Sequence, residues 1–194
     1  MSRVVVSTHV TLDGVMQAPG QPDEDLRGGF QHGGWQRPYA DQVMGDFIRQ
    51  KMGESGGLLL GRRTYETFAA FWPRQSADNP FSGVMNNIPK YVTSRTLTEP
   101  LAWSNSTLLS GDAAQSVADL KKRSGPDLTV VGSGALIKTL MEHDLVDEYR
   151  LLIHPLVLGT GRRLFAEGTS MAQLSLVDTV TTTTGVVIAT YRRA

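Results

Sequence analysis

The order of apolar and polar positions along the chain predicts an α/β protein. Short apolar runs that are typical of buried strands alternate with segments whose apolar residues recur at helical spacing. The predicted strands are 3–9, 58–60, 90–94, 108–109, 128–131 and 148–154, and the predicted helices are 41–52, 64–72, 112–122 and 135–143. Because the two kinds of element alternate, we expect a mostly parallel sheet flanked by helices. Two β-rich runs between 174 and 192, separated near Gly185, predict a closing antiparallel hairpin that makes the sheet mixed.

Two stretches lack a regular pattern. Residues 17–38 are rich in Gly, Pro, Asp and Gln, and residues 74–89 form a second predicted loop. Loops this long are uncommon inside a compact domain and are usually lids or binding loops. The first one carries the aromatic residues Phe30 and Trp35, which a loose surface excursion does not need. Since the chain shows no repeat, linker or low-complexity tract, we expect residues 1–194 to form one domain.

Composition narrows the class of protein. The formal net charge is zero, which argues against a nucleic-acid partner. The absence of cysteine excludes disulfides, thiolate metal sites and a cysteine nucleophile. No apolar run reaches the roughly 18 residues that a membrane span needs, and the first residues enter a strand pattern without a signal-peptide core. We therefore expect a cytoplasmic protein without a membrane partner.

Three polar junctions follow predicted strands. They are Leu60-Gly61-Arg62-Arg63-Thr64, Thr93-Ser94-Arg95-Thr96 and Val131-Gly132-Ser133-Gly134-Ala135. In a parallel sheet the carboxyl ends of the strands lie along one edge, where ligands bind. Glycines allow close backbone approach, hydroxyls donate, and arginines neutralise charge. Together the junctions predict a site for one extended, multiply phosphorylated ligand.

Other interpretations of these junctions are weaker. Each one taken alone could be an ordinary strand–turn–helix with solvated arginines, and a GC-rich genome would also produce the excess of fourteen arginines over five lysines. A Rossmann site would need a small residue where Ile137 stands, and its glycine turn should follow the first strand. A phosphate-binding P-loop is excluded, because no Gly-Lys-Ser/Thr follows a glycine loop.

Five motifs occur in an order that resembles a known superfamily. They are Leu-Gly-Arg-x-Thr-Tyr-Glu at 60–66, Lys-Tyr-Val-Thr-Ser-Arg-Thr at 90–96, Val-Gly-Ser-Gly-x-Leu at 131–136, Leu-Val-Asp-Glu at 145–148 and Pro-Leu-Val-Leu-Gly-x-Gly-x-x-Leu-Phe at 155–165. This order resembles the dihydrofolate-reductase-like superfamily. More closely, it is similar to stand-alone proteins that resemble the RibD C-terminal domain, the reductase of bacterial riboflavin biosynthesis.

The resemblance implies a twisted, mixed and mostly parallel sheet flanked by helices, and a bound NADPH. It assigns Gly61, Arg62, Arg63 and Thr64 to the cofactor's phosphates, Ser94, Arg95 and Thr96 to the adenosine 2′-phosphate, and Gly132, Ser133, Gly134, Ala135 and Leu136 to the pyrophosphate and nicotinamide side. Family members commonly pair as homodimers, so a homodimer is an expectation here.

The candidates for chemistry are less specific. Asp13, just after the first strand, could bind substrate or donate a proton, or it could belong to a plain Asp-Gly turn. Asp41, six residues after Trp35, could be a catalytic acid, as classical dihydrofolate reductases place a tryptophan and a pteridine-binding acid in this region with a spacing that differs by one. It could equally be a helix-terminal acid. Trp35 could wall a planar substrate, or it could simply pack.

Arg162 and Arg163 could hold a substrate phosphate, or they could be solvated loop arginines. The four histidines show no metal-ligand spacing, so we expect no metal. The expected function is an NADPH-dependent reductase that transfers hydride to a small heterocyclic, imine or carbonyl substrate, like 5-amino-6-(5-phosphoribosylamino)uracil reductase. The alternatives are a dihydrofolate reductase and a non-catalytic NADPH-binding protein of the same fold. A zinc-dependent deaminase is usually fused to the RibD reductase, and this chain has neither that domain nor a cysteine.

Overall fold

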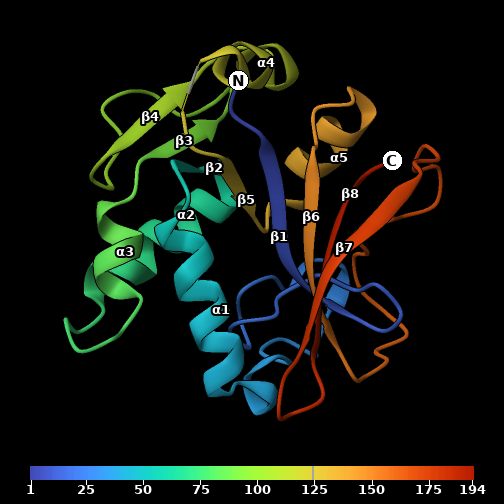
Figure 1. Cartoon of the computed structure of the whole chain (residues 1–194). Coiled ribbons are helices and arrows are strands. Elements are labelled where there is room, and N and C mark those ends of the chain that lie inside the picture. Colours follow the sequence, from blue (N-terminus) through green and yellow to red (C-terminus); the bar gives the residue numbers. More distant parts are fainter. Residues whose placement is uncertain (124) are drawn as a thin grey trace.

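The computed structural model describes residues 1–123 and 125–194, and the described part is built around one mixed sheet (Figure 1). The strands are β1 Val4–Thr11, β2 Gly57–Gly61, β3 Lys90–Thr93, β4 Ser106–Leu109, β5 Leu128–Val131, β6 Glu148–His154, β7 Leu174–Thr181 and β8 Val187–Arg193. Their order across the sheet is β4-β3-β2-β5-β1-β6-β8-β7. Strands β1 to β6 run parallel to one another, while β8 pairs antiparallel with both β6 and β7. The mixed, mostly parallel sheet and the closing hairpin are therefore confirmed.

The helices follow the strands as the sequence predicts. They are α1 Gln42–Gly53, α2 Arg62–Phe71, α3 Ser82–Asn87, α4 Ala113–Lys122 and α5 Gly134–Glu142, with short 3₁₀ turns at Arg27–Gly29, Arg37–Tyr39 and Trp72–Arg74. The prediction of a loop throughout 74–89 was wrong, because α3 lies within it. Helix α2 also begins two residues earlier than expected, so that Arg62 and Arg63 belong to its first turn. Of the helices described, none combines the length and apolar character needed to cross a bilayer.

Both faces of the sheet are covered. On one face, Val117 of α4 and Ile137 of α5 pack on Val4, Val6 and Val130 of the central strands. On the other face, α1 contributes Met52 to a cluster around Leu58 and Leu60 of β2, and Met44 to a second cluster with Leu152 and Ile188. Because the central strands are covered on both sides, their apolar runs are nearly continuous rather than alternating.

The long segment after β1 is an ordered part of the core. Phe30 and Trp35 are buried with Val15 and Ala18, and Leu156 and Leu158 from the loop after β6 pack against them. The aromatic residues therefore anchor this loop beside the carboxyl end of β1, as their presence in the sequence predicts.

Candidate functional site

The three polar junctions lie side by side at the carboxyl ends of the parallel strands. Strand β2 lies between β3 and β5, and Gly61 at its end is opposite Thr93 at the end of β3. The backbone N–H of Gly61 donates to Oγ of Ser133 at 2.9 Å, which joins the end of β2 to the turn after β5. We call this region, formed by 61–64, 93–96 and 132–136, the carboxyl edge.

Two helix N-termini at this edge lack side-chain caps. Gly61 is the N-cap of α2, and Ser133, whose hydroxyl accepts from Gly61 instead, is the N-cap of α5. By contrast, α1 and α4 are capped by the carboxylates of Asp41 and Asp112. The first N–H groups of a helix have no intrahelical acceptor, and the helix dipole favours negative charge there. The ends of α2 and α5 therefore present backbone donors to an anion.

The turn before α5 has an unusual backbone. Gly132 and Ser133 both have φ of 62°, and Ser133 is in the left-handed region with ψ of 53°. A non-glycine residue in this region costs free energy and is concentrated at functional sites. A Cβ on Gly132 would lie 3.6 Å from Cγ2 of Thr64, an ordinary contact, so the positive φ rather than crowding favours glycine here.

The arginines of the carboxyl edge are exposed. Arg62 pairs with Glu66 one helical turn away at 3.1 Å, whereas Arg63 and Arg95 have no ion-pair partner among the described residues. Oγ of Ser94 accepts from the N–H groups of Thr96 at 3.1 Å and Leu97 at 3.0 Å, which fixes the turn that carries Arg95. These side chains can therefore meet an anion at little cost in lost protein contacts. Ala135 is also exposed at this edge, while the side chain of Leu136 packs into the core.

The segment after β1 borders the same edge. A Cβ on Gly134 would lie 3.4 Å from Sδ of Met16. The backbone N–H of Met16 donates to the carbonyl of Arg162 at 2.8 Å, which brings the loop after β6 alongside. The carboxyl edge therefore continues into the two loops that carry the predicted substrate residues.

Asp13 links these two loops. Its carboxylate accepts from Oγ1 of Thr11 at 2.5 Å, from the N–H groups of Leu158 at 3.2 Å and Gly159 at 2.9 Å, and lies 3.3 Å from Nη2 of Arg163. The hydrogen bond from Thr11, with further ones from the two backbone N–H groups, lowers the pKa of Asp13 to about 2. A carboxyl group with this pKa is ionised at neutral pH, so its surroundings favour loop fixation over proton donation.

Arg162 and Arg163 lie in different surroundings. Arg163 is engaged with Asp13, since its Nε also donates to the Asp13 carbonyl at 2.8 Å. Arg162 instead lines a cavity of about 310 Å³, which we call the loop pocket. The residues around it are Gln17, Arg27, Gly28, Gly29, Phe30, Thr160, Gly161 and Arg162.

Gln17 builds the loop pocket and is not identifiable from a sequence motif. Its buried side chain donates to the carbonyls of Asp25 at 3.0 Å and Arg27 at 2.9 Å, and accepts from the N–H of Arg162 at 3.0 Å. One amide thus holds three loop segments together. The only sequence signal is its place after Met16 at the start of the long loop.

Trp35 contacts the backbone of Gln17. Its indole Nε1 donates to the Gln17 carbonyl at 2.8 Å, and its buried ring meets His154 edge-on, with ring centroids 5.1 Å apart. Trp35 is not among the residues that line the loop pocket. In this arrangement it supports the pocket through Gln17, and the prediction that it walls a substrate remains a prediction.

Two histidines, His9 near the end of β1 and His154 at the end of β6, form a pair beside Trp35. Nδ1 of His9 lies 2.9 Å from Nε2 of His154. Burial and the neighbouring His154 lower the pKa of His9 to about 3, and burial lowers that of His154 to about 4. Nδ1 of His154 is buried without a partner among the described residues. The sequence does not reveal this pair, because the two histidines meet only through the pairing of β1 with β6.

Asp41 lies at the start of α1 and does not contact Asp13. Its carboxylate accepts from the N–H of Met44 at 2.8 Å, and from both the N–H and the hydroxyl of Thr183 at 2.6 Å. The hydrogen bond from the Thr183 hydroxyl is the largest of the effects that lower its pKa. Asp41 is therefore a helix cap that also holds the turn between β7 and β8.

The sheet order, the covering helices and the polar carboxyl edge define a dihydrofolate-reductase-like α/β domain. Within this class, the chain belongs to the RibD C-terminal domain family, whose sequence pattern matches residues 2–188.

Two proteins of Bacillus subtilis are similar to the chain in sequence. The chain is 30% identical to the uncharacterized protein YyaP of Bacillus subtilis over 193 residues, which cover 97% of this chain and 94% of YyaP. It is 27% identical over 122 residues to the uncharacterized protein YwjB of the same organism, covering 63% and 65% of the two chains.

Solved structures share the fold. One is described as a "putative riboflavin biosynthesis protein" from Shewanella sp. PV-4, with a TM-score of 0.73, 24% identity and 99% of both chains covered. Another is a pyrimidine reductase-like protein from Corynebacterium diphtheriae, with a TM-score of 0.63, 12% identity, and 100% and 92% covered.

Proposed function

We propose that the protein is an NADPH-dependent reductase of a small heterocyclic, imine or carbonyl compound. The observation that carries the proposal is the pair of helix N-termini without side-chain caps, joined through Gly61 and Ser133 at the carboxyl edge. A dinucleotide with several phosphates suits such paired anion sites better than a singly charged ligand does.

The residues of the carboxyl edge can be assigned to successive parts of the cofactor. The N-termini of α2 and α5 would receive its phosphates, with Arg62 and Arg63 beside them. The exposed guanidinium of Arg95, on the turn fixed by Ser94, would bind the 2′-phosphate that distinguishes NADPH from NADH. NADPH, when bound, supplies a hydride to the substrate. Membership of the RibD C-terminal domain family supports the assignment.

The loop pocket is the proposed substrate end of the site. It borders the carboxyl edge through Met16, which is the neighbour of Gln17 and contacts Gly134. Its volume of about 310 Å³ suits a small heterocycle. The guanidinium of Arg162 would bind an anionic group such as a phosphate, as a ribosylaminopyrimidine phosphate requires, while that of Arg27 is already paired with Asp25.

One observation favours a second candidate, a non-catalytic NADPH-binding protein. Both carboxylates proposed for catalysis are held by protein donors: Asp13 by Thr11 and two loop N–H groups, and Asp41 by Met44 and Thr183. Neither is a protonated carboxylic acid at neutral pH. A reductase with this site would take its proton from solvent or from the substrate.

A cofactor titration tests the proposal. We expect NADPH to quench the tryptophan fluorescence saturably, and absorbance at 340 nm to fall when a suitable heterocycle is added. Dihydrofolate and 5-amino-6-(5-phosphoribosylamino)uracil are the first substrates to offer. Saturable binding without oxidation of any offered substrate would favour the non-catalytic candidate, and absence of NADPH binding would overturn both.

A further inference from the structure

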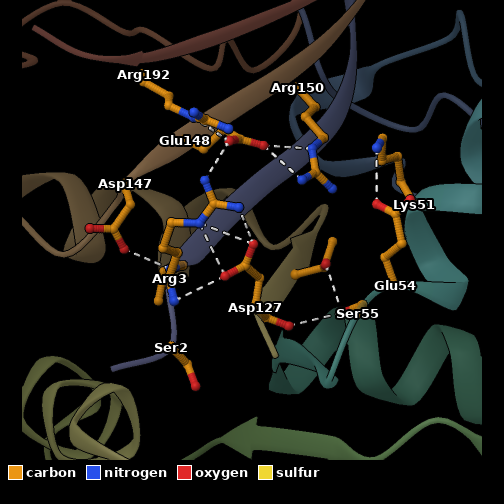
Figure 2. A network of polar contacts seen from close by, with 12 residues as sticks. Ser2, Arg3, Lys51, Glu54, Ser55, Asp127, Asp147, Glu148, Arg150 and Arg192 are labelled. Atoms are coloured by element: carbon orange, nitrogen blue, oxygen red, sulfur yellow. Dashed lines mark hydrogen bonds and ion pairs between the residues drawn. The ribbon is translucent and has the colours of Figure 1, made fainter. Parts of the chain in front are cut away.

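A second polar pocket lies at the opposite edge of the sheet, at the amino ends of β1, β5 and β6 and the end of α1 (Figure 2). The eight residues of β1 separate it from the carboxyl edge, a span of about 26 Å at roughly 3.3 Å per residue. Its volume is about 240 Å³. The residues around this amino-edge pocket are Arg3, Lys51, Glu54, Ser55, Asp127, Thr129, Glu148, Arg150, Val177, Asp178, Thr190 and Arg192.

A buried carboxylate organises the arginines of the amino-edge pocket. Glu148, whose side chain is 1% exposed, lies 2.7 Å from Nε of Arg150, 2.8 Å from Nε of Arg192 and 3.1 Å from Nη1 of Arg3. Burial alone would raise the pKa of Glu148, but the hydrogen bonds and charges of these arginines hold it below its usual value. Glu148 is therefore ionised, as a buried carboxylate with cationic partners can be.

The cluster holds more positive than negative charge. Arg3 is shared between Glu148 and Asp127, with Nε 3.1 Å from Asp127, so three guanidinium groups face two carboxylates. Lys51 on α1 is balanced by Glu54 at 2.9 Å. Asp178, exposed on β7, also lines the pocket and would repel a second negative charge on any ligand. With Asp178 and the Lys51–Glu54 pair included, the charged side chains around the pocket balance, so a ligand with a single negative charge fits better than a multiply charged one.

Donors inside this pocket are left without acceptors. Arg150, whose side chain is 9% exposed, uses Nε and Nη2 on one oxygen of Glu148, each at 2.7 Å. Its Nη1 has no acceptor among the residues that the structure describes, nor does the hydroxyl of the buried Thr190. Neither of these two donors is among the fully buried atoms, so both can reach a ligand in the pocket. Figure 2 shows the Arg150 guanidinium between Glu148 and the Lys51–Glu54 pair.

We propose that the amino-edge pocket binds a small monocarboxylate. Its two oxygens would accept from Nη1 of Arg150 and from the Thr190 hydroxyl, with the remaining N–H groups of Arg192 nearby. A planar carboxylate matches the geometry of a guanidinium edge, and the pocket is smaller than those that hold drug-sized ligands. This site goes beyond the proposed reductase and does not depend on it.

An acetate titration of the full-length protein without NADPH tests this proposal. Acetate replaces chloride at constant ionic strength, and ¹H–¹⁵N NMR follows the arginine Nε–H signals and the backbone amides. We expect saturable shifts at Arg150, Arg192 and Thr190. Shifts that grow linearly, or that fall only at Arg27 and Arg162 of the loop pocket, would overturn the proposal, as would saturation by phosphate but not by acetate.

Two variants make the test specific. Thr190→Val keeps the shape of a strand residue and removes one donor, so acetate should bind about tenfold more weakly. Arg150→Met should abolish saturation. The matched control is Thr179→Val on the exposed part of β7, which should bind like the wild type. If Thr190→Val leaves acetate affinity unchanged, the pocket is not the binding site, whatever the fate of Arg150→Met.

Discussion

At the scale of single residues, existing hydrogen bonds and ion pairs decide which charged side chains remain available to a ligand. Asp13 and Arg163 are both charged and lie in the two loops beside the carboxyl edge, yet each is already engaged with the other. Arg63 and Arg95 are exposed and have no ion-pair partner among the described residues. An anionic ligand would gain the full interaction with these two arginines, because no existing ion pair must first be broken.

Arg95→Ala should therefore separate the two nicotinamide cofactors. We expect NADPH to bind at least about tenfold more weakly, the magnitude of a lost charge-assisted hydrogen bond, while NADH binding changes little. Isothermal titration calorimetry with both cofactors measures the ratio. The matched control is Arg49→Ala, which changes a half-buried arginine of α1 that is paired with Asp46. Equal losses for NADPH and NADH would contradict the assignment of Arg95 to the 2′-phosphate.

At the scale of elements, most helices and strands are predictable because their signals are local. The range of β6 agrees with the prediction, and the helix predicted at 112–122 is α4, with Asp112 as its cap. Helix α3 was missed because its six residues, Ser-Gly-Val-Met-Asn-Asn, carry no amphipathic period and few good helix formers.

The candidate site is also only partly predictable from the sequence. The polar junctions of the carboxyl edge are visible in the sequence, because glycines and hydroxyls interrupt apolar strands there. Gln17, the His9–His154 pair and the cluster around Glu148 are not visible. Each of them depends on contacts between distant segments, such as the pairing of β1 with β6, which no local pattern specifies.

The role of Asp41 as the cap of α1 can be tested by substitution. Asp41→Ala removes the cap of α1 and the link to Thr183, so the melting temperature should fall by several degrees. Asp41→Asn should retain most of the stability, because Asn is an equally good cap. Thermal unfolding of both variants, together with NADPH oxidation, distinguishes the roles. If Asp41→Asn keeps its melting temperature but loses turnover, Asp41 is a catalytic acid rather than a cap.

At the scale of the whole molecule, the two ends of the parallel sheet hold different polar systems. The carboxyl edge presents backbone donors and exposed arginines, while the amino edge holds a buried cluster around Glu148 (Figures 1 and 2). Between them most of the buried side chains of the central strands are apolar, such as Val6, Leu59 and Val130. Changes at one edge should therefore leave the other edge intact, so the two ligand proposals can be tested separately.

The histidine pair should make global stability depend on pH. The pKa of His9 is lowered from 6.5 to about 3 and that of His154 to about 4, so the folded protein keeps both neutral while the unfolded chain protonates them below pH 6.5. Stability is thus complete above pH 6.5 and is lost as the pH falls through this window. The loss should approach about 1.4 kcal/mol per pH unit for each histidine.

Urea unfolding at a series of pH values between 7 and about 5 measures this dependence, in a range above the ordinary pKa values of the carboxylates. His9→Gln removes one titrating ring and should roughly halve the slope of the unfolding free energy against pH. His143→Gln, which changes an exposed histidine, is the control and should keep the wild-type slope. A wild-type slope in His9→Gln would mean that the buried pair does not stay neutral in the folded protein, and that acid sensitivity arises elsewhere in the sheet.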